Sequence, residues 1–421
     1  MRKLLSFALV ATTTYLPSAV FSSDFGMLFV NSSSLGVGYA DWSTATNDAS
    51  VTYTNPAALV ELSHQQPMVN PLGIVGSTKF TGTSQTPLFA YPNAVVQHGT
   101  AHGSIEAFSP SFFFAKPLSE RVTYGVGVTA PFGLGTEYSR KSMVRYAATT
   151  SQVVGIDLSP SLGFKFDEHL SFGAGFDVLY MKVVLDNMYG PPLSPLADST
   201  LQNHVKGWGY GWHAGSLLKL SPQTRAGLTY YSIIRAKTEG YSAVDSPEGD
   251  HLRAIDQGID AALPARADFS VQHDITSRWT AMATVFYTNW ESFDQIVMRH
   301  TMTPMGRSLS VNIPFNYHNC FDYAIGATFK ANDKWLLRGG LLYLNTPSND
   351  RHRGVADPVG YATVVTVGVH YQQNDALGYD LGVGHSFFKT MPIHYTNPLT
   401  SLVGRSETQT TVIGGQLTWR M

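Results

Sequence analysis

Large apolar side chains recur at every second position over long stretches of this chain. In residues 206–220, one phase of the alternation holds large apolar side chains and the other holds mainly glycine. The apolar phase consists of Trp208, Tyr210, Trp212, Ala214, Leu218 and Leu220. A helix would scatter the two sets, whereas a β-strand places them on opposite faces. Because the same alternation returns in residues 334–343, 361–371 and 413–421, we expect an all-β protein.

Composition and strand length favour a membrane barrel over a soluble β-sandwich. Only 14% of the residues are charged, against about 25% in an ordinary soluble domain. The alternating stretches are longer than the usual five or six residues of a strand, and aromatic residues stand at the ends of their apolar faces. The formal net charge of −2 gives no basic footprint for nucleic acid, and the single cysteine excludes a disulfide framework.

The first 22 residues have the pattern of an export signal. Arg2 and Lys3 precede an uncharged apolar stretch at residues 4–16, and small residues follow up to Ser22. That stretch is too short to span a bilayer as a helix, so we predict a signal peptide, residues 1–22, that is removed on export.

The connections between the expected strands alternate between short and long. Short polar turns are expected near residues 116–121, 165–169, 220–225, 273–278, 330–334 and 372–376. Longer stretches, rich in Gly, Pro, Ser and Asn, separate them. This alternation predicts a transmembrane antiparallel β-barrel of about 14 strands over residues 67–421, with the short turns and both chain ends on the periplasmic side.

Residues 23–66 precede the first expected strand and read as a plug inside the barrel. Asn55 followed by Pro56 is a helix-capping pattern, which predicts one or two helical turns from Ala57. The alternative is a disordered periplasmic tail, but the segment carries many apolar anchors, which such a tail rarely has.

These motifs resemble one known family. The segments Asn31–Gly36, Asn47–Ala49 and Tyr53–Leu59, the last with its Asn55-Pro56-Ala57 element, are similar to the N-terminal hatch of the OMPP1/FadL/TodX family. The resemblance continues through Pro131–Tyr138, Trp208–Gly215, Tyr287–Trp290 and Trp335–Gly340. It implies a monomeric channel of the Gram-negative outer membrane for passive uptake of long-chain fatty acids or other hydrophobic molecules, aromatic hydrocarbons among them.

The resemblance also implies that the hatch moves and that ligand leaves sideways, through a gap where the third strand is kinked. Our third strand runs from Arg121 to about Pro131, and Gly133 follows closely. Proline removes a ladder donor and favours a bulge or an edge. We therefore consider Pro131 and Gly133 as the kink, with the alternative that Pro131 only begins the next loop.

Two residues are candidates for ligand contact through the resemblance. Phe25 occupies the position of a pocket phenylalanine, with ordinary plug packing as the alternative. Lys182 occupies the position of a cation near the ligand head group, where it would pair with a carboxylate. However, Lys182 is in phase with Phe172, Phe176 and Tyr180 on the expected lipid face, so it either follows a register change or extends to the interface.

Sequence motifs of enzymes are not found. There is no Gly-x-Ser-x-Gly element, no His-Glu-x-x-His and no phosphate-binding loop, and the histidines lack the spacing of metal ligands. We therefore expect no catalytic residues, metal or cofactor. The alternative is an outer-membrane lipase whose Ser/His pair is assembled only in space, but the sequence selects no such pair. The remaining alternatives are a general porin and a surface protein for adhesion or phage reception. Arg351, His352 and Arg353 in an expected outer loop are candidate contacts to lipopolysaccharide, with an ordinary solvated loop as the favoured alternative.

Overall fold

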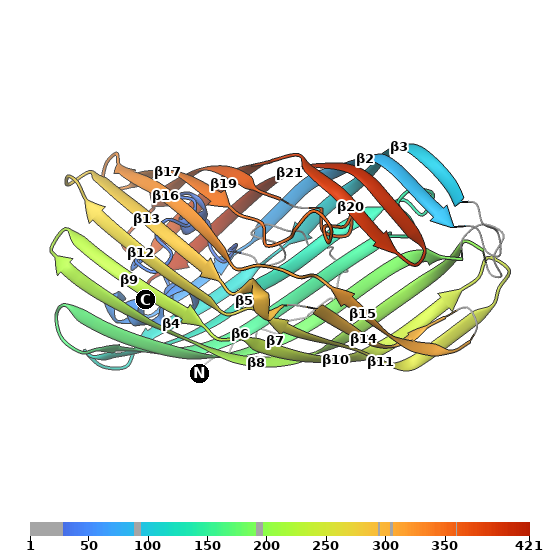
Figure 1. Ribbon diagram of the computed structural model, residues 1–421. Coiled ribbons are helices and arrows are strands. Elements are labelled where there is room, and N and C mark those ends of the chain that lie inside the picture. Colours follow the sequence, from blue (N-terminus) through green and yellow to red (C-terminus); the bar gives the residue numbers. More distant parts are fainter. Residues whose placement is uncertain (1–27, 88–93, 191–196, 294, 304–305, 359) are drawn as a thin grey trace, which may run out of the picture.

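The chain forms a closed antiparallel β-barrel. The computed structural model describes residues 28–421 except 88–93, 191–196, 294, 304–305 and 359. In this part of the chain, 21 strand segments form one sheet, which closes because the last strand, β21 (Thr400–Trp419), pairs with β1 (Gln66–Asn70) and β2 (Leu72–Pro87). The segments compose 14 antiparallel spans around the wall (Figure 1). The predicted fold class and strand number are confirmed.

Half of the spans run without interruption and half are broken into two segments. The uninterrupted spans are β21 and six others: β5 (Val122–Tyr138), β6 (Thr150–Lys165), β7 (Leu170–Tyr189), β8 (Ser199–Ser221), β17 (Trp335–Leu344) and β18 (Ala362–Gln372). The broken spans are β1 with β2, β3 (Ala94–Phe108) with β4 (Ser111–Pro117), β9 (Thr224–Tyr231) with β10 (Ile234–Asp245), β11 (His251–Leu263) with β12 (Arg266–Asp274), β13 (Trp279–Thr288) with β14 (Gln295–Met302), β15 (Ser308–Pro314) with β16 (Cys320–Lys330), and β19 (Leu377–Phe388) with β20 (Met391–Asn397). A short 3-10 helix, η2 (Trp290–Ser292), lies between β13 and β14.

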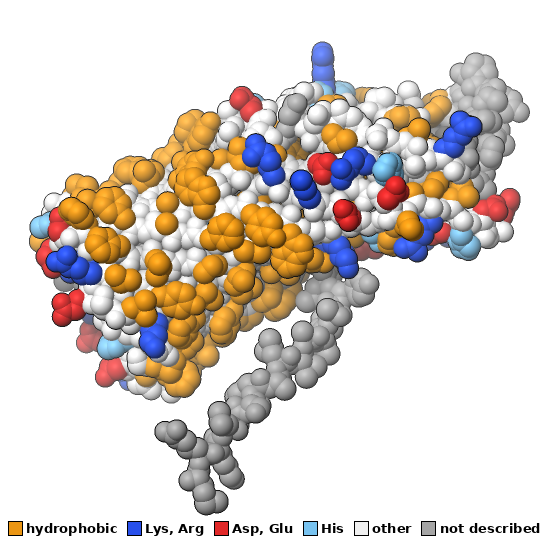
Figure 2. Space-filling model, turned by 90° about the horizontal axis from the view of Figure 1, so that it is seen from below, with side chains coloured by type: hydrophobic (Ala, Val, Ile, Leu, Met, Phe, Trp, Pro, Cys, Tyr) orange, Lys and Arg blue, Asp and Glu red, His pale blue; other side chains and the backbone are white. Residues whose placement is uncertain are grey.

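The alternation seen in the sequence separates the two faces of the wall. On β8, Trp208, Tyr210 and Trp212 are exposed, whereas His213 is fully buried. On the face seen in Figure 2, the hydrophobic side chains gather in a band across the barrel, with ionic side chains on both sides of it. Such a band is the lipid-facing surface of an outer-membrane barrel. In the described residues, no helix is long and apolar enough to cross a membrane.

The described part of the N-terminal segment, residues 28–65, lies inside the barrel near the end that carries the short turns (Figure 1). It contains α1 (Ser32–Leu35), α2 (Val51–Thr54) and η1 (Pro56–Glu61). Its polar groups reach strands around the wall: the amide of Ser32 donates to Gln416 Oε1 over 3.2 Å, and the carbonyl of Ala40 accepts from Thr284 over 2.8 Å. We call residues 28–65 the hatch. Gln66, which ends the predicted plug range, is the first residue of β1.

Glycines on the inner face let the hatch backbone lie directly against the wall. A Cβ added to Gly340 of β17 would overlap the backbone of Val37, and one added to Gly173 of β7 would overlap the backbone of Pro56. By contrast, Gly339, the outward-facing neighbour of Gly340, has nothing within 4 Å of that position. The glycine phase of the strands is therefore the docking surface for the hatch.

Gly340 and Gly339 allow a matched test of this docking surface. We expect Gly340→Ala to weaken hatch docking by about 1–3 kcal/mol, the usual effect of overpacking, because the new methyl meets backbone atoms. Gly339→Ala makes the same change in open space and is expected to leave docking unchanged. The rate at which a protease cleaves the hatch in the folded barrel measures the difference. Equal cleavage rates in the two variants would contradict the assigned contact.

Candidate functional site

The third span, β5, carries a bulge. Thr129 pairs with Asp157 of β6 and Phe132 pairs with Gly155, so β5 holds one more residue than β6 over this interval. Pro131 lies in the bulge, where its missing N–H removes no ladder bond. Because β5 continues to Tyr138, the alternative that Pro131 begins a loop is wrong, and the strand is longer than the sequence suggested.

Next to the bulge, the wall is not fully paired. β5 pairs with β4 up to Val128, opposite Phe112, and with β3 only from Glu137, opposite Ser104. Between these points, residues 129–136 of β5 and 105–111 of the neighbouring span form no ladder pair with each other, whereas on their other edges they pair with β6 and with β1 and β2. We call this opening in the ladder the wall gap. Gly133 lies in it. Unpaired strand edges are a departure from the rule for membrane barrels.

A cavity of about 50 Å³ lies on the inner side of the bulge. Tyr53 of the hatch, Pro131 and Phe132 of the bulge, and Trp290 of η2 form part of its wall. Asp157, Asp177 and Arg266 also line it. We call it the bulge cavity. Residues of both the hatch and the bulge line this one space.

Beside the bulge cavity, three buried side chains fasten the hatch to the wall. His213 Nδ1 lies 2.7 Å from Asp177 Oδ1, and His213 Nε2 lies 3.1 Å from both Ser161 Oγ and the carbonyl oxygen of Thr52 in the hatch. Ser161 donates to the same carbonyl over 2.9 Å. The order Ser–His–Asp is that of a hydrolytic triad. Here the hatch backbone lies against the serine and the histidine, so the arrangement serves attachment.

A second attachment joins β12 to the hatch. Arg266 Nε donates to Asp268 over 2.9 Å, and the guanidinium lies 4.6 Å from the ring centroids of both Trp42 and Tyr231. The Tyr231 hydroxyl accepts from the Trp42 indole over 3.0 Å and donates to the carbonyl of Tyr53 over 2.8 Å. Cation–π contact and hydrogen bonds therefore hold this side of the hatch.

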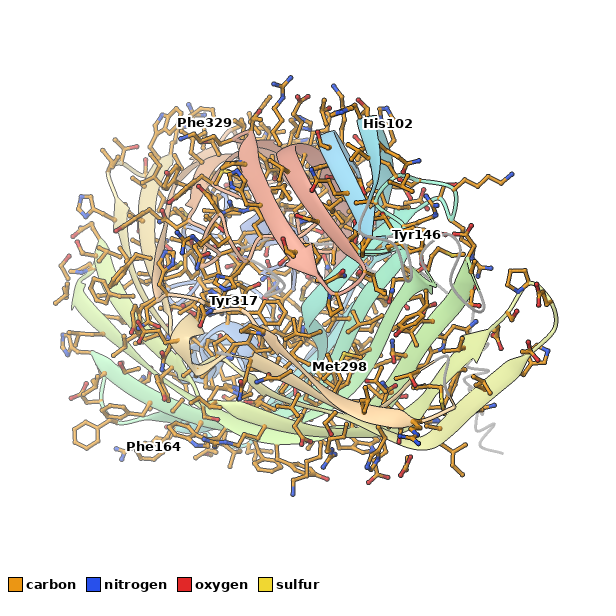
Figure 3. All side chains as sticks on the ribbon, turned by 45° about the vertical axis from the view of Figure 1, so that its right-hand side comes forward. His102, Tyr146, Phe164, Met298, Tyr317 and Phe329 are labelled. Atoms are coloured by element: carbon orange, nitrogen blue, oxygen red, sulfur yellow. The ribbon has the colours of Figure 1, made fainter. Side chains whose placement is uncertain are left out.

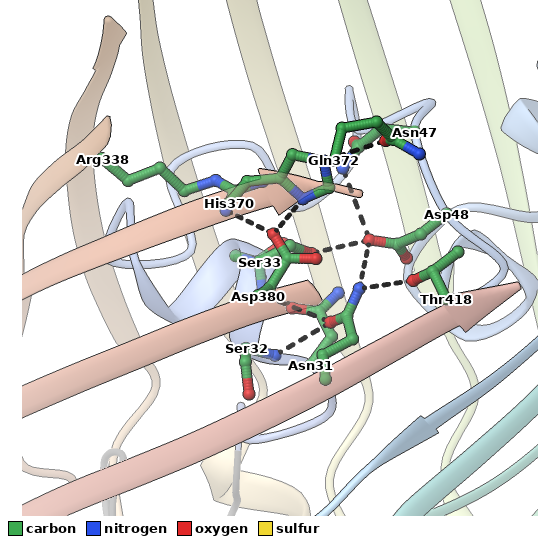
Figure 4. Close-up of polar contacts among 12 residues, drawn as sticks. Asn31, Ser32, Ser33, Asn47, Asp48, Arg338, His370, Gln372, Asp380 and Thr418 are labelled. Atoms are coloured by element: carbon green, nitrogen blue, oxygen red, sulfur yellow. Dashed lines mark hydrogen bonds and ion pairs between the residues drawn. The ribbon is translucent and has the colours of Figure 1, made fainter. Parts of the chain in front are cut away.

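A third polar network lies near β21 (Figure 4). Asp48 accepts from Ser33 over 2.7 Å and from Gln416 over 3.0 Å. Beside it, Asp380 accepts from Arg338 over 2.5 Å and lies 2.9 Å from His370 Nδ1. Buried Asp380 is therefore paired with the Arg338 cation, whereas buried Asp48 is satisfied by hydrogen bonds from neutral side chains.

An apolar cluster continues from the bulge cavity toward the long connections. Ile234 and Trp290 belong to both, and the cluster extends to Leu179, Met181 and Tyr317. Figure 3 shows Tyr317 and Met298 within the lumen, whereas Phe164 and Phe329 lie on the outside of the wall. The interior thus offers an apolar surface that leads down to the bulge cavity.

The hatch motif forms a capped turn at the wall. Asn55 Oδ1 accepts from the amide of Ala57 over 3.1 Å at the start of η1, which begins at Pro56, so the predicted cap is confirmed. Asn55 Nδ2 donates to the carbonyls of Ser43, over 2.7 Å, and Ser216, over 3.0 Å. The side chain therefore joins two parts of the hatch to β8.

The two candidate ligand contacts have different outcomes. Phe25 lies outside the described residues. Lys182 alternates with Met181 and Val183, which are buried in the inner cluster, and it pairs across the ladder with Lys206, which is exposed. Its position favours the interface over the lumen.

Arg353 also differs from the expectation of an accessible cation in an outer loop. Its side chain is buried, and Nη2 donates to the carbonyl of Ser348 over 2.8 Å while Nη1 pairs with Asp350 over 2.7 Å. It stabilises its own loop, so the expectation that it contacts lipopolysaccharide is wrong.

Four residues of this region were not predicted from the sequence: Asp157, Asp177, His213 and Arg266. Their position in the two-residue alternation could have identified them. Each stands among the small or polar residues of a membrane strand, where an ionisable side chain must face the lumen. In the described part of the chain, no group of three or more His, Cys, Asp or Glu residues could hold a metal ion.

Comparison with known proteins gives one consistent family. Residues 13–421 match the model of a family described as outer membrane protein transport protein (OMPP1/FadL/TodX). A long-chain fatty acid transport protein of Salmonella typhi is 22% identical over 416 residues, covering 92% of each chain. Outer membrane protein P1 of Haemophilus influenzae is 25% identical over 407 residues, covering 88% of this chain and 87% of the relative.

Solved structures share the fold. A FadL homologue of Pseudomonas aeruginosa superimposes with a TM-score of 0.83 at 20% identity, covering 94% of this chain and 99% of the other. The toluene transporter TodX of Pseudomonas putida superimposes with a TM-score of 0.72 at 17% identity, covering 95% and 100%.

The contacts of Asn55 generate a second prediction. Asn55→Asp keeps the cap acceptor but loses both donors, so each buried carbonyl left unpaired is expected to weaken hatch docking by about 1–3 kcal/mol. Asn55→Ala loses the cap as well and is expected to weaken docking further. Asn47→Ala, at an exposed position of the same segment, is the control. Hydrogen exchange of the hatch amides measures the effect, and unchanged protection in Asn55→Ala would refute it.

Asp41 makes hatch docking depend on pH. Burial raises the pKa of the Asp41 carboxyl above its ordinary value. The docked hatch therefore favours the protonated form: the stabilisation is complete below the ordinary carboxyl pKa of about 3.9 and is lost as pH rises through the higher pKa of the docked state. We expect faster proteolysis of the hatch at neutral pH than near pH 4, after correction for protease activity. Asp41→Asn should reduce this dependence, whereas Asp375→Asn, in an exposed turn, should retain it.

Proposed function

Because the chain belongs to the OMPP1/FadL/TodX family of outer membrane transport proteins, we propose that it takes up long-chain fatty acids or other hydrophobic molecules passively. The protein is a β-barrel of the Gram-negative outer membrane, and members of its family are transport channels. Relatives named for long-chain fatty acid transport and for toluene transport support these two ligand classes.

The observation that carries the proposal is the wall gap with the bulge cavity behind it. Ligand descends the apolar cluster, enters the bulge cavity and leaves between β3 and β5 into the bilayer. Each methylene that moves from water into an apolar environment gains about 0.8 kcal/mol. A long acyl chain is therefore stabilised by lateral exit into lipid, whereas an exit below the hatch would return it to water.

Hatch movement is part of the proposal. A cavity of about 150 Å³ is known to hold a benzene molecule, and the bulge cavity measures only about 50 Å³. A ligand must therefore displace wall or hatch side chains such as Tyr53 and Phe132 as it passes. The filled lumen argues against a general porin, and the aromatic lining supports aromatic hydrocarbons as a second ligand class.

The remaining assignments follow from position. Phe25, which precedes the hatch in the sequence, stays a proposed ligand contact. Lys182, beside Lys206 on the outer face, is better suited to outer-membrane lipid and lipopolysaccharide than to ligand in the lumen. We propose a monomer, because one chain encloses the whole path.

Removal of the bulge tests the route. Deletion of Ala130 takes out the extra residue and lets Thr129 and Phe132 pair in continuous register with β6. Pro131→Ala, which keeps the residue count, is the matched control. In liposomes carrying the folded protein, we expect the deletion to reduce transfer of a labelled long-chain fatty acid to the rate of protein-free liposomes, whereas Pro131→Ala retains transfer. A folded deletion variant with wild-type transfer would refute lateral exit at this bulge.

A further inference from the structure

Three neighbouring strands carry basic side chains on the outer face of the wall, at one border of the hydrophobic band. Lys182 of β7 stands directly opposite Lys206 of β8 in the ladder, so both side chains are on the same face. On β10, Lys237 stands opposite Trp208, the next outward-facing residue after Lys206, and Arg235 precedes Lys237 on the same face. We call Lys182, Lys206, Arg235 and Lys237 the basic patch.

The basic patch lies toward the extracellular end of the barrel. From Lys206, β8 runs back to Ser199 at a long connection, whereas its other end, Ser221, leads into a short turn. In barrels of this class, short turns are periplasmic and long connections are extracellular. In Figure 2, Lys and Arg side chains stand along the border of the hydrophobic band that is nearer the long connections. The patch therefore faces the outer leaflet.

Positive charge is in excess in the basic patch. Like charges directly opposite one another in a ladder are destabilising, and Lys182 with Lys206 is such a pair. Glu239 stands opposite Lys206 on the other side and offsets one of the four positive charges. An anion bound between the strands would convert the remaining repulsion into attraction.

Other acids beside the patch are already paired with cations or histidine. Asp260, on the strand next to β10, lies 3.3 Å from Arg299. Asp186, farther from the membrane on β7, lies 3.0 Å from His204 Nε2. These carboxylates are engaged away from the four cations, so the excess of positive charge remains.

Aromatic rings form a ledge on the membrane side of the patch. Tyr180 precedes Lys182 on the outer face of β7, and its ring centroid lies 5.1 Å from that of Trp208, edge to face. Trp208 and Tyr210 are exposed. Such rings mark the level at which acyl chains meet head groups. A lipid whose chains lie against this ledge places its head group at the basic patch.

We propose that the basic patch binds the phosphates of a phosphorylated glycolipid of the outer leaflet, the lipid A part of lipopolysaccharide. Lys206 and Lys237 are diagonal neighbours in the ladder, and their flexible stems allow both ammonium groups to reach one phosphate. Ammonium–phosphate contacts of this kind are charge-assisted hydrogen bonds. The site lies outside the wall, apart from the transport path, and extends the assignment of Lys182 from one residue to a complete site.

Other lipids fit the basic patch less well. A zwitterionic phospholipid brings a cation of its own beside its phosphate, and this cation is repelled by the patch. An anionic phospholipid with one phosphate engages either the β7–β8 pair of lysines or the two cations of β10. A head group with two phosphates engages both sets.

Titration with matched lipids tests the proposal. The folded protein in a neutral detergent is titrated with bisphosphorylated lipid A, with the same lipid lacking its phosphates, and with phosphatidylglycerol. Native mass spectrometry measures the bound fraction. We expect lipid A to bind at least tenfold more tightly than the other two, because each lysine or arginine near an anionic lipid surface contributes about a factor of five.

Two double variants locate the site. Lys206→Gln combined with Lys237→Gln is expected to weaken lipid A binding about thirtyfold. Lys330→Gln combined with Lys334→Gln removes the same charge at a short turn on the opposite border of the membrane, where both lysines are exposed, and should retain binding. Equal weakening in the two double variants would show an effect of net charge alone and would overturn the site.

The remaining outcomes are equally decisive. Equal affinity for lipid A with and without phosphates would overturn the proposal, and equal affinity for phosphatidylglycerol would contradict the choice of a glycolipid. Displacement of lipid A by equimolar inorganic phosphate would assign the patch to a soluble anion instead. None of these results touches fatty-acid uptake, which transfer into liposomes tests separately. The comparison of lipids uses the wild-type protein, so it holds even if a double variant does not fold.

Discussion

The demand that every backbone amide and carbonyl in the membrane be paired governs this structure. Lipid offers no hydrogen bonds, so a sheet that crosses it must close, and here β21 closes the wall by pairing with β1 and β2. The wall gap beside β5 is a departure from that rule within the described wall. It coincides with a one-residue bulge, a proline and an internal cavity, the features on which the proposed lateral exit rests.

The interior follows a second rule, that buried polar groups must be satisfied. The hatch lies against inward-facing glycines and is held by polar contacts from several strands, through Gln416, His213 and Tyr231 among others. Each contact pairs a hatch carbonyl or amide that would otherwise be buried alone.

The sequence predicted the parts of the fold that depend on local pattern. Two-residue alternation and connection length were sufficient for the barrel and its strand number, because each strand exposes one face to lipid. The cap at Asn55 was also predictable, since it involves only residues 55–57. The outward phase of Lys182 was visible as well, and it already conflicted with a role in the lumen.

What the sequence could not supply depends on closure of the barrel. Asp157, Asp177, His213 and Arg266 come from four different strands, and only the register of the closed wall brings the two aspartates and Arg266 to the bulge cavity and His213 beside it. The breaks in half of the spans were likewise not predictable. The extent of β5 beyond Pro131 was not predicted, because a proline ordinarily marks the end of a strand. In the structure Pro131 lies in a bulge, where its missing N–H removes no ladder bond, so the strand continues.

Photo-crosslinking tests most directly whether ligand leaves through the wall. A long-chain fatty acid with a diazirine at its apolar end would be activated on the protein in lipid, and the adducts mapped by mass spectrometry. Lateral exit predicts adducts in residues 105–111 and 129–136, on the two sides of the wall gap, together with the bulge cavity. Adducts confined to the hatch and the short turns, with none at the wall gap, would show passage along the barrel axis and contradict the account.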